Sequence, residues 1–146
     1  MKIKQAELKD VDVLAELFDL YRLFYGQESD IEGAKAFLNE RLSESQSTIF
    51  LATVEQKGVG FAQLYPSYSS VSMKRTWILN DLYVKKEQRG SGIGEALLQQ
   101  VLDYAKETGT KGVLLETNED NVVAQSLYEK MGFERETHRF YFYTVK

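Results

Sequence analysis

Three glycines fall within five residues, at positions 90, 92 and 94, in the segment EQRGSGIGEALL. Glycine loses more conformational freedom on folding than any other residue, so three of them in ordered backbone need a reason. The segment stands between RTWILNDLYV at 75–84, which is typical of a strand, and an amphipathic pattern that continues to about Thr108. We therefore expect a strand, a tight turn and a long helix, followed by a parallel strand at 112–118 after a right-handed crossover.

The glycine turn allows more than one interpretation. A dinucleotide-binding fingerprint fails because the glycines alternate and position 95 is glutamate, and a Walker A loop fails because no Gly-Lys-Ser/Thr follows. Spacing alone leaves two interpretations open, a turn that only needs unusual backbone angles and a cradle for a diphosphate. In a cradle, bare backbone N–H groups and the positive end of the helix dipole face the anion. Arg89, Ser91, Lys85 and Lys86 would then add side-chain donors.

Hydrophobic periodicity predicts one domain, residues 1–146, with a mixed α/β fold. Its sheet of about seven strands is expected to be mostly antiparallel with one parallel pair, and about four helices flank it. The expected strands include 2–6, 48–55, 58–68, 75–84, 112–118 and 138–146, and the helices lie at about 10–25, 30–42, 93–108 and 122–131. A turn around Lys57–Gly58 makes a hairpin, and Gly26 and Gly132 end helices, with Phe133 packing back. Pro66 marks a bulge, an edge or a strand end.

The composition argues against several classes of function. The chain of 146 residues has no cysteine, which rules out disulfides, thiolate nucleophiles and thiolate metal sites. A formal net charge of −4 with scattered basic residues argues against nucleic acid as the main partner. No apolar run approaches the length of a membrane span, and MKIKQAELKD lacks the apolar core of a signal peptide. We expect a cytoplasmic protein with no membrane partner and no metal site.

Two blocks together resemble the GNAT superfamily of N-acetyltransferases. LYVKKEQRGSGIGEALL meets the family's diphosphate motif, Gln/Arg-x-x-Gly-x-Gly/Ala, with Arg89, Gly92 and Gly94. NVVAQSLYEKMGF matches the frequent Asn…Tyr-Glu-Lys-x-Gly-Phe signature, and the matching residues are Asn121, Tyr128, Glu129, Lys130, Gly132 and Phe133. The resemblance implies the family's acyltransferase fold, acetyl-coenzyme A as donor and a primary amine as acceptor. It also implies direct transfer with no acyl-enzyme.

The resemblance also implies which residues bind the cofactor. The strands around 82–84 and 113–117 would splay apart, and the pantetheine arm would pair with backbone groups of Leu82 and Val84, on either side of Tyr83. A backbone N–H in this stretch would polarise the thioester carbonyl. The diphosphate would lie on Arg89, Gly90, Ser91, Gly92, Ile93 and Gly94. Asn121, which by residue type alone is a helix cap, would also contact the arm.

Tyr128 resembles the family's general acid, which protonates the departing thiolate of coenzyme A and contacts the cofactor. A phenol can donate to a thiolate of comparable basicity, so this role is chemically reasonable. Spacing alone favours a different role for Tyr128, a ring packed in the core. The matched signature favours the acid.

Asp81 is the candidate general base, because an alkylammonium acceptor must lose a proton before it attacks. Strand alternation places Asp81 and Tyr83 on one face and Asn80 on the other. The alternatives are a carboxylate that only anchors structure, the weaker candidate Glu116, and a reaction in which water takes the proton.

The acceptor is expected to bind near the first two helices and the central strands, with Tyr25, Glu28 and Asp81 as substrate-binding residues. FAQLYPSYSSVSMKRTWILNDLYV is loosely similar to the polyamine (diamine) acetyltransferase branch, which implies a polyamine or an amino-acid-like amine. Where that branch has Leu-Glu-Asp, this chain has Leu79-Asn80-Asp81. The alternatives are a coenzyme A-binding module without turnover and an acetyltransferase of protein N-termini or lysines. The resemblance leaves a homodimer open.

Overall fold

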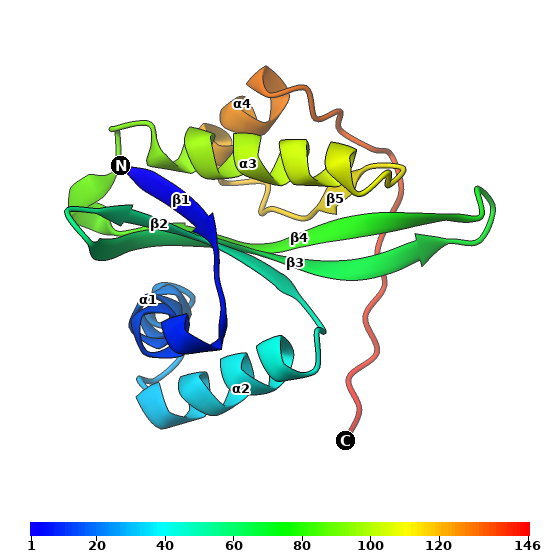
Figure 1. Ribbon diagram of the computed structural model, residues 1–146. Helices are drawn as coiled ribbons and strands as arrows, with labels where there is room; N and C mark the ends of the chain where they lie inside the picture. Colours follow the sequence, from blue (N-terminus) through cyan, green and yellow to red (C-terminus); the bar gives the residue numbers. More distant parts are fainter. The chain divides into compact units, whose positions relative to one another are not determined.

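The computed structural model describes residues 1–146, which divide into two compact units, 1–116 and 117–146. The first unit holds a sheet and three α-helices (Figure 1). Its elements are β1 (Lys2–Gln5), α1 (Val11–Phe24), α2 (Ile31–Ser43), β2 (Thr48–Val54), β3 (Lys57–Ser69), β4 (Lys74–Val84), α3 (Ile93–Glu107) and β5 (Val113–Leu115), with 3-10 turns at Leu8–Asp10 and Lys86–Gln88. The second unit contains α4 (Val122–Lys130). The single domain expected from the sequence stays a prediction.

The five strands lie side by side in sequence order. All neighbours are antiparallel except β4 and β5, which are parallel. The helices α1 and α2 cover one face of this sheet and α3 covers the other (Figure 1). The predicted mixed α/β fold with one parallel pair is therefore confirmed, although the sheet has five strands where about seven were expected.

Strand β2 is buried on both faces, which explains its nearly continuous apolar sequence TIFLATV. Ile49 and Leu51 join the core formed with α1 and α2. Phe50 points to the opposite face, where its ring centroid lies 5.3 Å from that of Tyr104 on α3. The sheet is thus a central layer with a hydrophobic core on each side.

A bulge in β4 decides which side chains face which helices. Gln63 of β3 pairs with Asp81, but the next residue, Leu64, pairs with Leu79, so Asn80 is an extra residue in β4. Paired residues lie on the same face and consecutive residues lie on opposite faces. Leu79 therefore faces α3, whereas Asp81 faces α1 and α2. Tyr83, which shares the face of Asp81 as predicted, packs its ring against Tyr21 of α1.

Strands β4 and β5 separate after a short parallel stretch. Their pairing stops at Leu79 and Leu115, and the rest of β4, to Val84, has only β3 as a paired strand. The N–H of Lys85 donates toward β3, to a carbonyl 2.8 Å away. Because backbone groups alternate in direction along a strand, the N–H groups of Val84 and Leu82 face the open edge. This is the splayed pair that the family resemblance implied.

Two helix boundaries lie at the residues that the sequence predicted. Gly26, which follows Tyr25 at the C-terminal end of α1, has a φ of +85°. Asp30 caps α2, where its carboxylate accepts from the N–H of Gly33 at 2.9 Å. Pro66 lies in the part of β3 that extends past the pairing with β2, which ends at Leu64. It therefore occupies an edge position, one of the three predicted alternatives.

The hairpin between β2 and β3 turns two residues earlier than predicted. Glu55 and Gln56 both have positive φ, +51° and +69°, which is the pattern of a two-residue type I′ turn. Lys57 and Gly58 already belong to β3. A Cβ at Gly58 would lie 2.5 Å from Cγ1 of Val13 on α1. This glycine allows a helix to approach the strand closely, which the sequence pattern could not distinguish from a turn.

In the second unit, α4 is closed at both ends by local motifs. The side chain of Asn121 accepts a backbone N–H of the first turn at 3.3 Å, which confirms its predicted role as a cap. Gly132 has a φ of +101°. The N–H groups of Gly132 and Phe133 donate to the carbonyls of Glu129 and Tyr128, the pattern of a Schellman motif. The ring of Phe133 packs back on Tyr128 at 5.9 Å, as predicted.

The strand predicted at 138–146 does not form. Residues 133–146 lie in neither a helix nor a strand, although HRFYFYTVK has the aromatic and β-branched residues typical of strands. Aromatic and β-branched residues make a segment suitable for a strand, but they do not by themselves form one. A strand is completed by ladder hydrogen bonds to a neighbour, and a sequence pattern does not reveal whether a neighbour is available. This segment accounts for part of the difference between five strands and seven.

No helix of the structure combines the length and the apolar character that a membrane span requires. The structure also contains no group of three or more histidine, cysteine, aspartate or glutamate side chains arranged to hold a metal ion.

Candidate functional site

The glycine turn joins β4 to α3 through two residues with left-handed backbone. Gly90 has a φ of +84°, and Gly92, the residue that caps α3, has a φ of +86°. A Cβ at either residue would have no other atom within 4 Å, so both glycines border open space. Gly94 lies inside α3, where a Cβ would make an ordinary contact with Val84 at 3.8 Å. The turn therefore presents bare backbone to open space at the positive end of a helix, where an anion such as a diphosphate can bind.

Side chains hold this turn against the end of β4. Arg89 Nε donates to the carbonyl of Val84 at 2.9 Å. The Arg89 guanidinium lies 5.4 Å from the ring centroid of Phe24 and 5.6 Å from that of Tyr83. Ser91 Oγ donates to a backbone carbonyl within the turn. The hydrogen bond between Arg89 and β4 involves Nε and neither of the two terminal nitrogens.

Asp81, which is 4% exposed, is held by two side-chain amides. Gln63 Nε2 donates to Oδ2 at 2.6 Å, and Asn80 Nδ2 donates to Oδ1 at 3.0 Å. Gln63 is fully buried, and its Oε1 accepts from Ser47 Oγ at 2.8 Å. Burial raises the pKa of the Asp81 carboxyl, while the hydrogen bonds from Gln63, Tyr21 and Asn80 oppose the rise. The carboxyl therefore holds a proton more readily than an ordinary aspartate does, and it has little contact with solvent.

Tyr65 adds a phenol near this carboxyl. Burial is the main reason why the pKa of Tyr65 rises to about 12; the negative charge of Asp81 adds to the rise and Arg41 opposes it. Arg41 lies on α2, where its guanidinium stacks over the ring of Phe37 at 4.4 Å. Strands β3 and β4 and helix α2 thus bring a carboxyl, a phenol and a guanidinium into one region.

Tyr21 connects the predicted acceptor residue Tyr25 to this region. Its hydroxyl donates to the backbone carbonyl of Asn80 at 3.4 Å, and its ring centroid lies 5.0 Å from that of Tyr25. Tyr25 is 56% exposed at the end of α1. Glu28 lies in the connection that follows, and its backbone carbonyl accepts from Arg22. The ring of Tyr25 therefore contacts Tyr21, and the hydroxyl of Tyr21 is bonded to the residue next to Asp81. Glu28 is bonded instead to Arg22 of α1.

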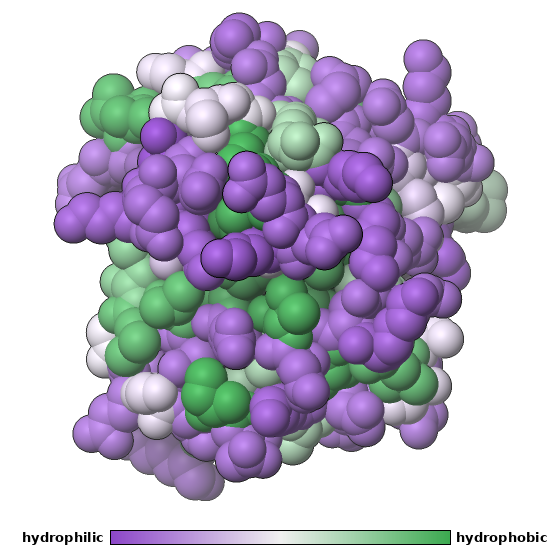
Figure 2. Space-filling model, turned by 60° about the vertical axis from the view of Figure 1, so that its left-hand side comes forward, coloured by the Kyte–Doolittle hydropathy of each residue, from purple (hydrophilic) through white to green (hydrophobic).

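Helix α1 also carries exposed apolar side chains, which are Val13, Leu20, Leu23 and Phe24. Figure 2 shows apolar side chains gathered across the middle of the face that it brings forward, between hydrophilic ones. The end of α1 with Phe24 and Tyr25 offers aromatic surface to solvent.

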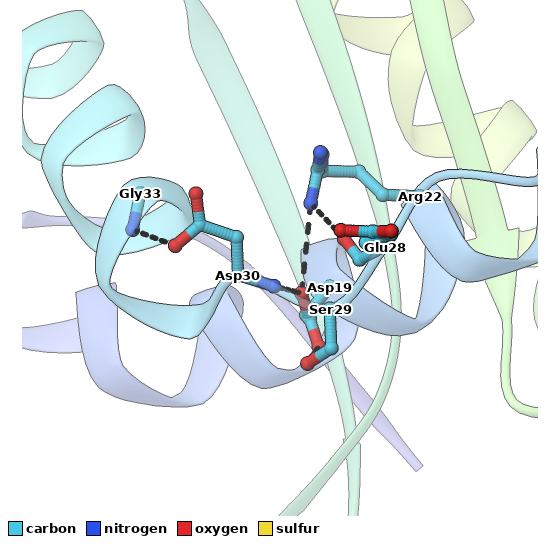
Figure 3. Close-up of polar contacts among 6 residues, drawn as sticks. All are labelled: Asp19, Arg22, Glu28, Ser29, Asp30 and Gly33. Atoms are coloured by element: carbon cyan, nitrogen blue, oxygen red, sulfur yellow. Dashed lines mark hydrogen bonds and ion pairs between the residues drawn. The ribbon is translucent and has the colours of Figure 1, made fainter.

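Asp19 anchors the connection between α1 and α2 (Figure 3). Its carboxylate accepts from Ser29 Oγ and from the Asp30 N–H, both at 2.7 Å. Arg22 Nη1 lies 3.7 Å from Asp19 Oδ1 and donates to the carbonyl of Glu28 at 2.9 Å. The hydrogen bond from Asp30 is the main reason why the pKa of Asp19 is lowered; burial opposes the shift, and Ser29 and Arg22 add to it. The connection that carries Glu28 is thus tied to α1.

We expect Asp19→Asn to lower the free energy of unfolding at pH 7 by about 2 kcal/mol, the scale of a hydrogen bond to a charged group. Folding lowers the pKa of Asp19, so its contribution is present above the unfolded pKa of about 3.9 and is lost as pH falls through the folded pKa. Urea unfolding at pH 7 and pH 3 measures this, with Asp12→Asn as an exposed control on the same helix. Equal differences between the native chain and Asp19→Asn at both pH values would contradict the prediction.

The remaining predicted residues lie in the second unit. Asn121 caps α4, and Tyr128 lies in its last turn with its ring against Phe133. The cofactor contact of Asn121 and the acid role of Tyr128 stay predictions.

Sequence reasoning missed Ser47, Gln63 and Asp19. A signal was available for Gln63, because the amide stands within the apolar run GFAQLY, and a buried amide needs hydrogen-bond partners. Asp19 lies one residue after Phe18 in the apolar pattern of α1, which is a weaker signal. Nothing in the sequence distinguishes Ser47 from other serines before a strand.

Comparison with known proteins gives consistent findings. Residues 14–133 match the model of the Acetyltransferase (GNAT) family. YhfO of Bacillus subtilis, an uncharacterized N-acetyltransferase, is 47% identical over 137 residues, which are 94% of this chain and 92% of that protein. A probable acetyltransferase of Haemophilus influenzae is 33% identical over 135 residues, 92% of this chain and 90% of that protein. A crystal structure of a probable acetyltransferase superposes with a TM-score of 0.90 at 45% identity, covering 100% of this chain and 97% of that one.

Proposed function

Because the chain belongs to the acetyltransferase (GNAT) family and is an acetyl-transferring enzyme, we propose that it moves an acetyl group from acetyl-coenzyme A directly to the primary amine of a small molecule. The observation that carries the proposal is the turn between β4 and α3, which borders open space at Gly90 and Gly92.

The residues present fit coenzyme A. The first turn of α3, a helix of 15 residues, offers backbone N–H groups and a positive dipole end to a diphosphate. Next to it, the N–H groups of Leu82 and Val84 face the edge of β4 that β5 leaves open. An extended arm with amide groups can bind such an edge as an added strand does. The side chain of Asn121 is proposed to contact the same arm.

Acetyl-coenzyme A, when bound, supplies the acetyl group as an activated thioester. A backbone N–H at the open edge of β4 donates to the carbonyl oxygen and stabilises the charge that develops there. As the amine nitrogen bonds to the acetyl carbon and the carbon–sulfur bond breaks, the hydroxyl of Tyr128 would donate its proton to the leaving sulfur, and water would take the proton that the amine loses. The predicted base role of Asp81 is not part of this mechanism; it stays a prediction, and the residue exchange described below tests it.

The acceptor is proposed to be a polyamine or an amino-acid-like amine that binds near Tyr25, Glu28 and Asp81. The phenols of Tyr21 and Tyr65 support this placement, because phenol oxygens accept hydrogen bonds from an ammonium group. The predicted substrate contact of Asp81 is tested by the residue exchange described below.

Release of coenzyme A thiol from acetyl-coenzyme A, measured with a panel of amines, tests the proposal. The panel contains polyamines, amino acids, and peptides with a free N-terminus or a lysine. We expect at least one small amine to raise thiol release at least tenfold over the amine-free background. Release with peptides alone would favour an acetyltransferase of proteins. Tight binding of acetyl-coenzyme A without release for any amine would contradict turnover and favour a binding module.

A further inference from the structure

We propose that Gln63 is a positioning residue, which holds Asp81 and with it the bulge of β4, and that the reaction needs a hydrogen-bond acceptor at position 81 and not a base. The proposal rests on the proposed function, because the bulge orients the backbone N–H groups that are assigned there to the cofactor arm.

The orientation of the Gln63 amide is determined by its two partners. Ser47 Oγ donates to Oε1 at 2.8 Å, so the NH₂ end of the amide turns toward Asp81 and donates to Oδ2 at 2.6 Å. Gln63 is fully buried, where an amide without partners would be costly. Ser47, Gln63 and Asp81 thus form one hydrogen-bonded chain.

This chain ends at the bulge. Gln63 and Asp81 are the last pair before the register between β3 and β4 shifts. The extra residue, Asn80, is held twice, because its side chain donates to Asp81 Oδ1 and its carbonyl accepts from Tyr21. The register and the side chain of the bulge are therefore tied to the carboxyl of Asp81, and its backbone is tied to Tyr21 of α1.

The bulge determines which backbone groups reach the open edge of β4. An inserted residue reverses the faces and the hydrogen-bonding directions of every residue that follows it in a strand. With Asn80 inserted, the N–H groups of Leu82 and Val84 point away from β3. Without the insertion they would point toward it. By stabilising the bulge, the carboxyl of Asp81 therefore keeps the backbone N–H groups of Leu82 and Val84 directed toward the open edge of β4.

The surroundings of Asp81 fit an acceptor better than a base. A general base must come within hydrogen-bond distance of the proton that it removes, or reach it through one water. Both oxygens of Asp81 already accept from amides, and the residue is 4% exposed.

Exchanging the amide and the carboxylate separates the two roles. Gln63→Glu places two carboxyl groups face to face, and Asp81→Asn places two amides face to face. In the double variant Gln63→Glu/Asp81→Asn, the amide at position 81 can donate to the carboxylate at position 63, so the pair again has one donor and one acceptor. The net charge is that of the native chain, and the carboxylate at position 63 still offers an oxygen to the hydroxyl of Ser47. Only the carboxylate at position 81 is missing.

We expect each single variant to lower kcat by about 10²-fold with little change in KM for the amine, the loss that a misplacement of about 1 Å causes. The double variant should return to within about threefold of the native kcat, with an unchanged pH profile. The matched control is the exchange Gln99→Glu/Asp103→Asn, an amide–carboxylate pair on the exposed face of α3, which should leave kcat unchanged. Circular dichroism and thermal unfolding report whether each variant is folded.

A double variant that is unfolded, or as slow as Asp81→Asn, would overturn the proposal, and so would single variants with native kcat. The same variants are titrated with coenzyme A in a calorimeter, which needs no turnover. If no amine is acetylated by the native chain, the proposed function fails, and calorimetry alone decides about Gln63. We then expect each single variant to bind at least tenfold more weakly and the double variant to bind as the native chain does; equal affinities throughout would reject the positioning role.

Discussion

Replacing Tyr128 by phenylalanine is expected to lower kcat for acetyl transfer by about 10²- to 10⁴-fold, the usual contribution of a positioned general acid. The substitution removes the hydroxyl that is proposed to protonate the leaving sulfur. It keeps the ring, so the packing against Phe133 at 5.9 Å and the end of α4 stay intact. Steady-state kinetics of thiol release with the best amine of the panel measures kcat, and calorimetry measures the affinity for acetyl-coenzyme A, which should change less than threefold.

Tyr104→Phe is the matched control for the loss of a phenol. Its hydroxyl shares a hydrogen bond of 3.2 Å with Thr48 Oγ1, between α3 and β2. We expect a loss of about 1 kcal/mol in the free energy of unfolding and an unchanged kcat. If Tyr128→Phe retained native kcat, the acid role would be excluded and the core-packing role of this ring would stand.

Gly92→Val is expected to weaken the binding of acetyl-coenzyme A by at least about 10²-fold, a loss of about 2.7 kcal/mol or more. A side chain at this position would enter the open space that borders the turn, where the diphosphate is proposed to reach the backbone N–H groups. The φ of +86° adds strain of about 1–2 kcal/mol to any residue with a Cβ. A domain of this size is typically stable by about 5–15 kcal/mol, so the variant should remain folded and its affinity can be measured by calorimetry.

Two control variants separate binding from strain. Gly109→Val places the same side chain on left-handed backbone, with a φ of +66° and open space around it, but just after the C-terminal end of α3. It should cost similar stability and leave the affinity unchanged. Gly94→Ala fits without strain inside α3 and should also bind normally. An unchanged affinity for Gly92→Val, or an equal loss for Gly109→Val, would contradict a cradle at this turn.

The parts of the site that could be predicted are those that depend on neighbours in the chain. The turn of Gly90 and Gly92, the cap at Asp30 and the end of α4 at Gly132 each need particular residues within a few positions, because only those residues satisfy the local backbone angles and N–H groups. The apolar pattern of β2 likewise indicated a buried strand.

The polar cluster around Asp81 could not be predicted, because its members come from three separate elements. Asp81 and Gln63 meet only when β3 and β4 pair in one particular register, and Tyr21 joins them only when α1 packs on that face. A single sequence gives the face alternation of a strand but not the position of a bulge. Gly58 shows the same limit, since its close contact with α1 resembles a turn signal until the helix is in place.

The sequence by itself determined the order of the elements from β1 to α4, the ends of the helices and the bare glycine turn, because backbone sterics and hydrogen bonds to near neighbours decide these features. The tertiary structure alone decided the bulge at Asn80 and the hydrogen-bonded chain from Ser47 to Asp81. These features depend on pairing between segments far apart in the chain, and such pairing is settled by packing and register, which no local pattern contains.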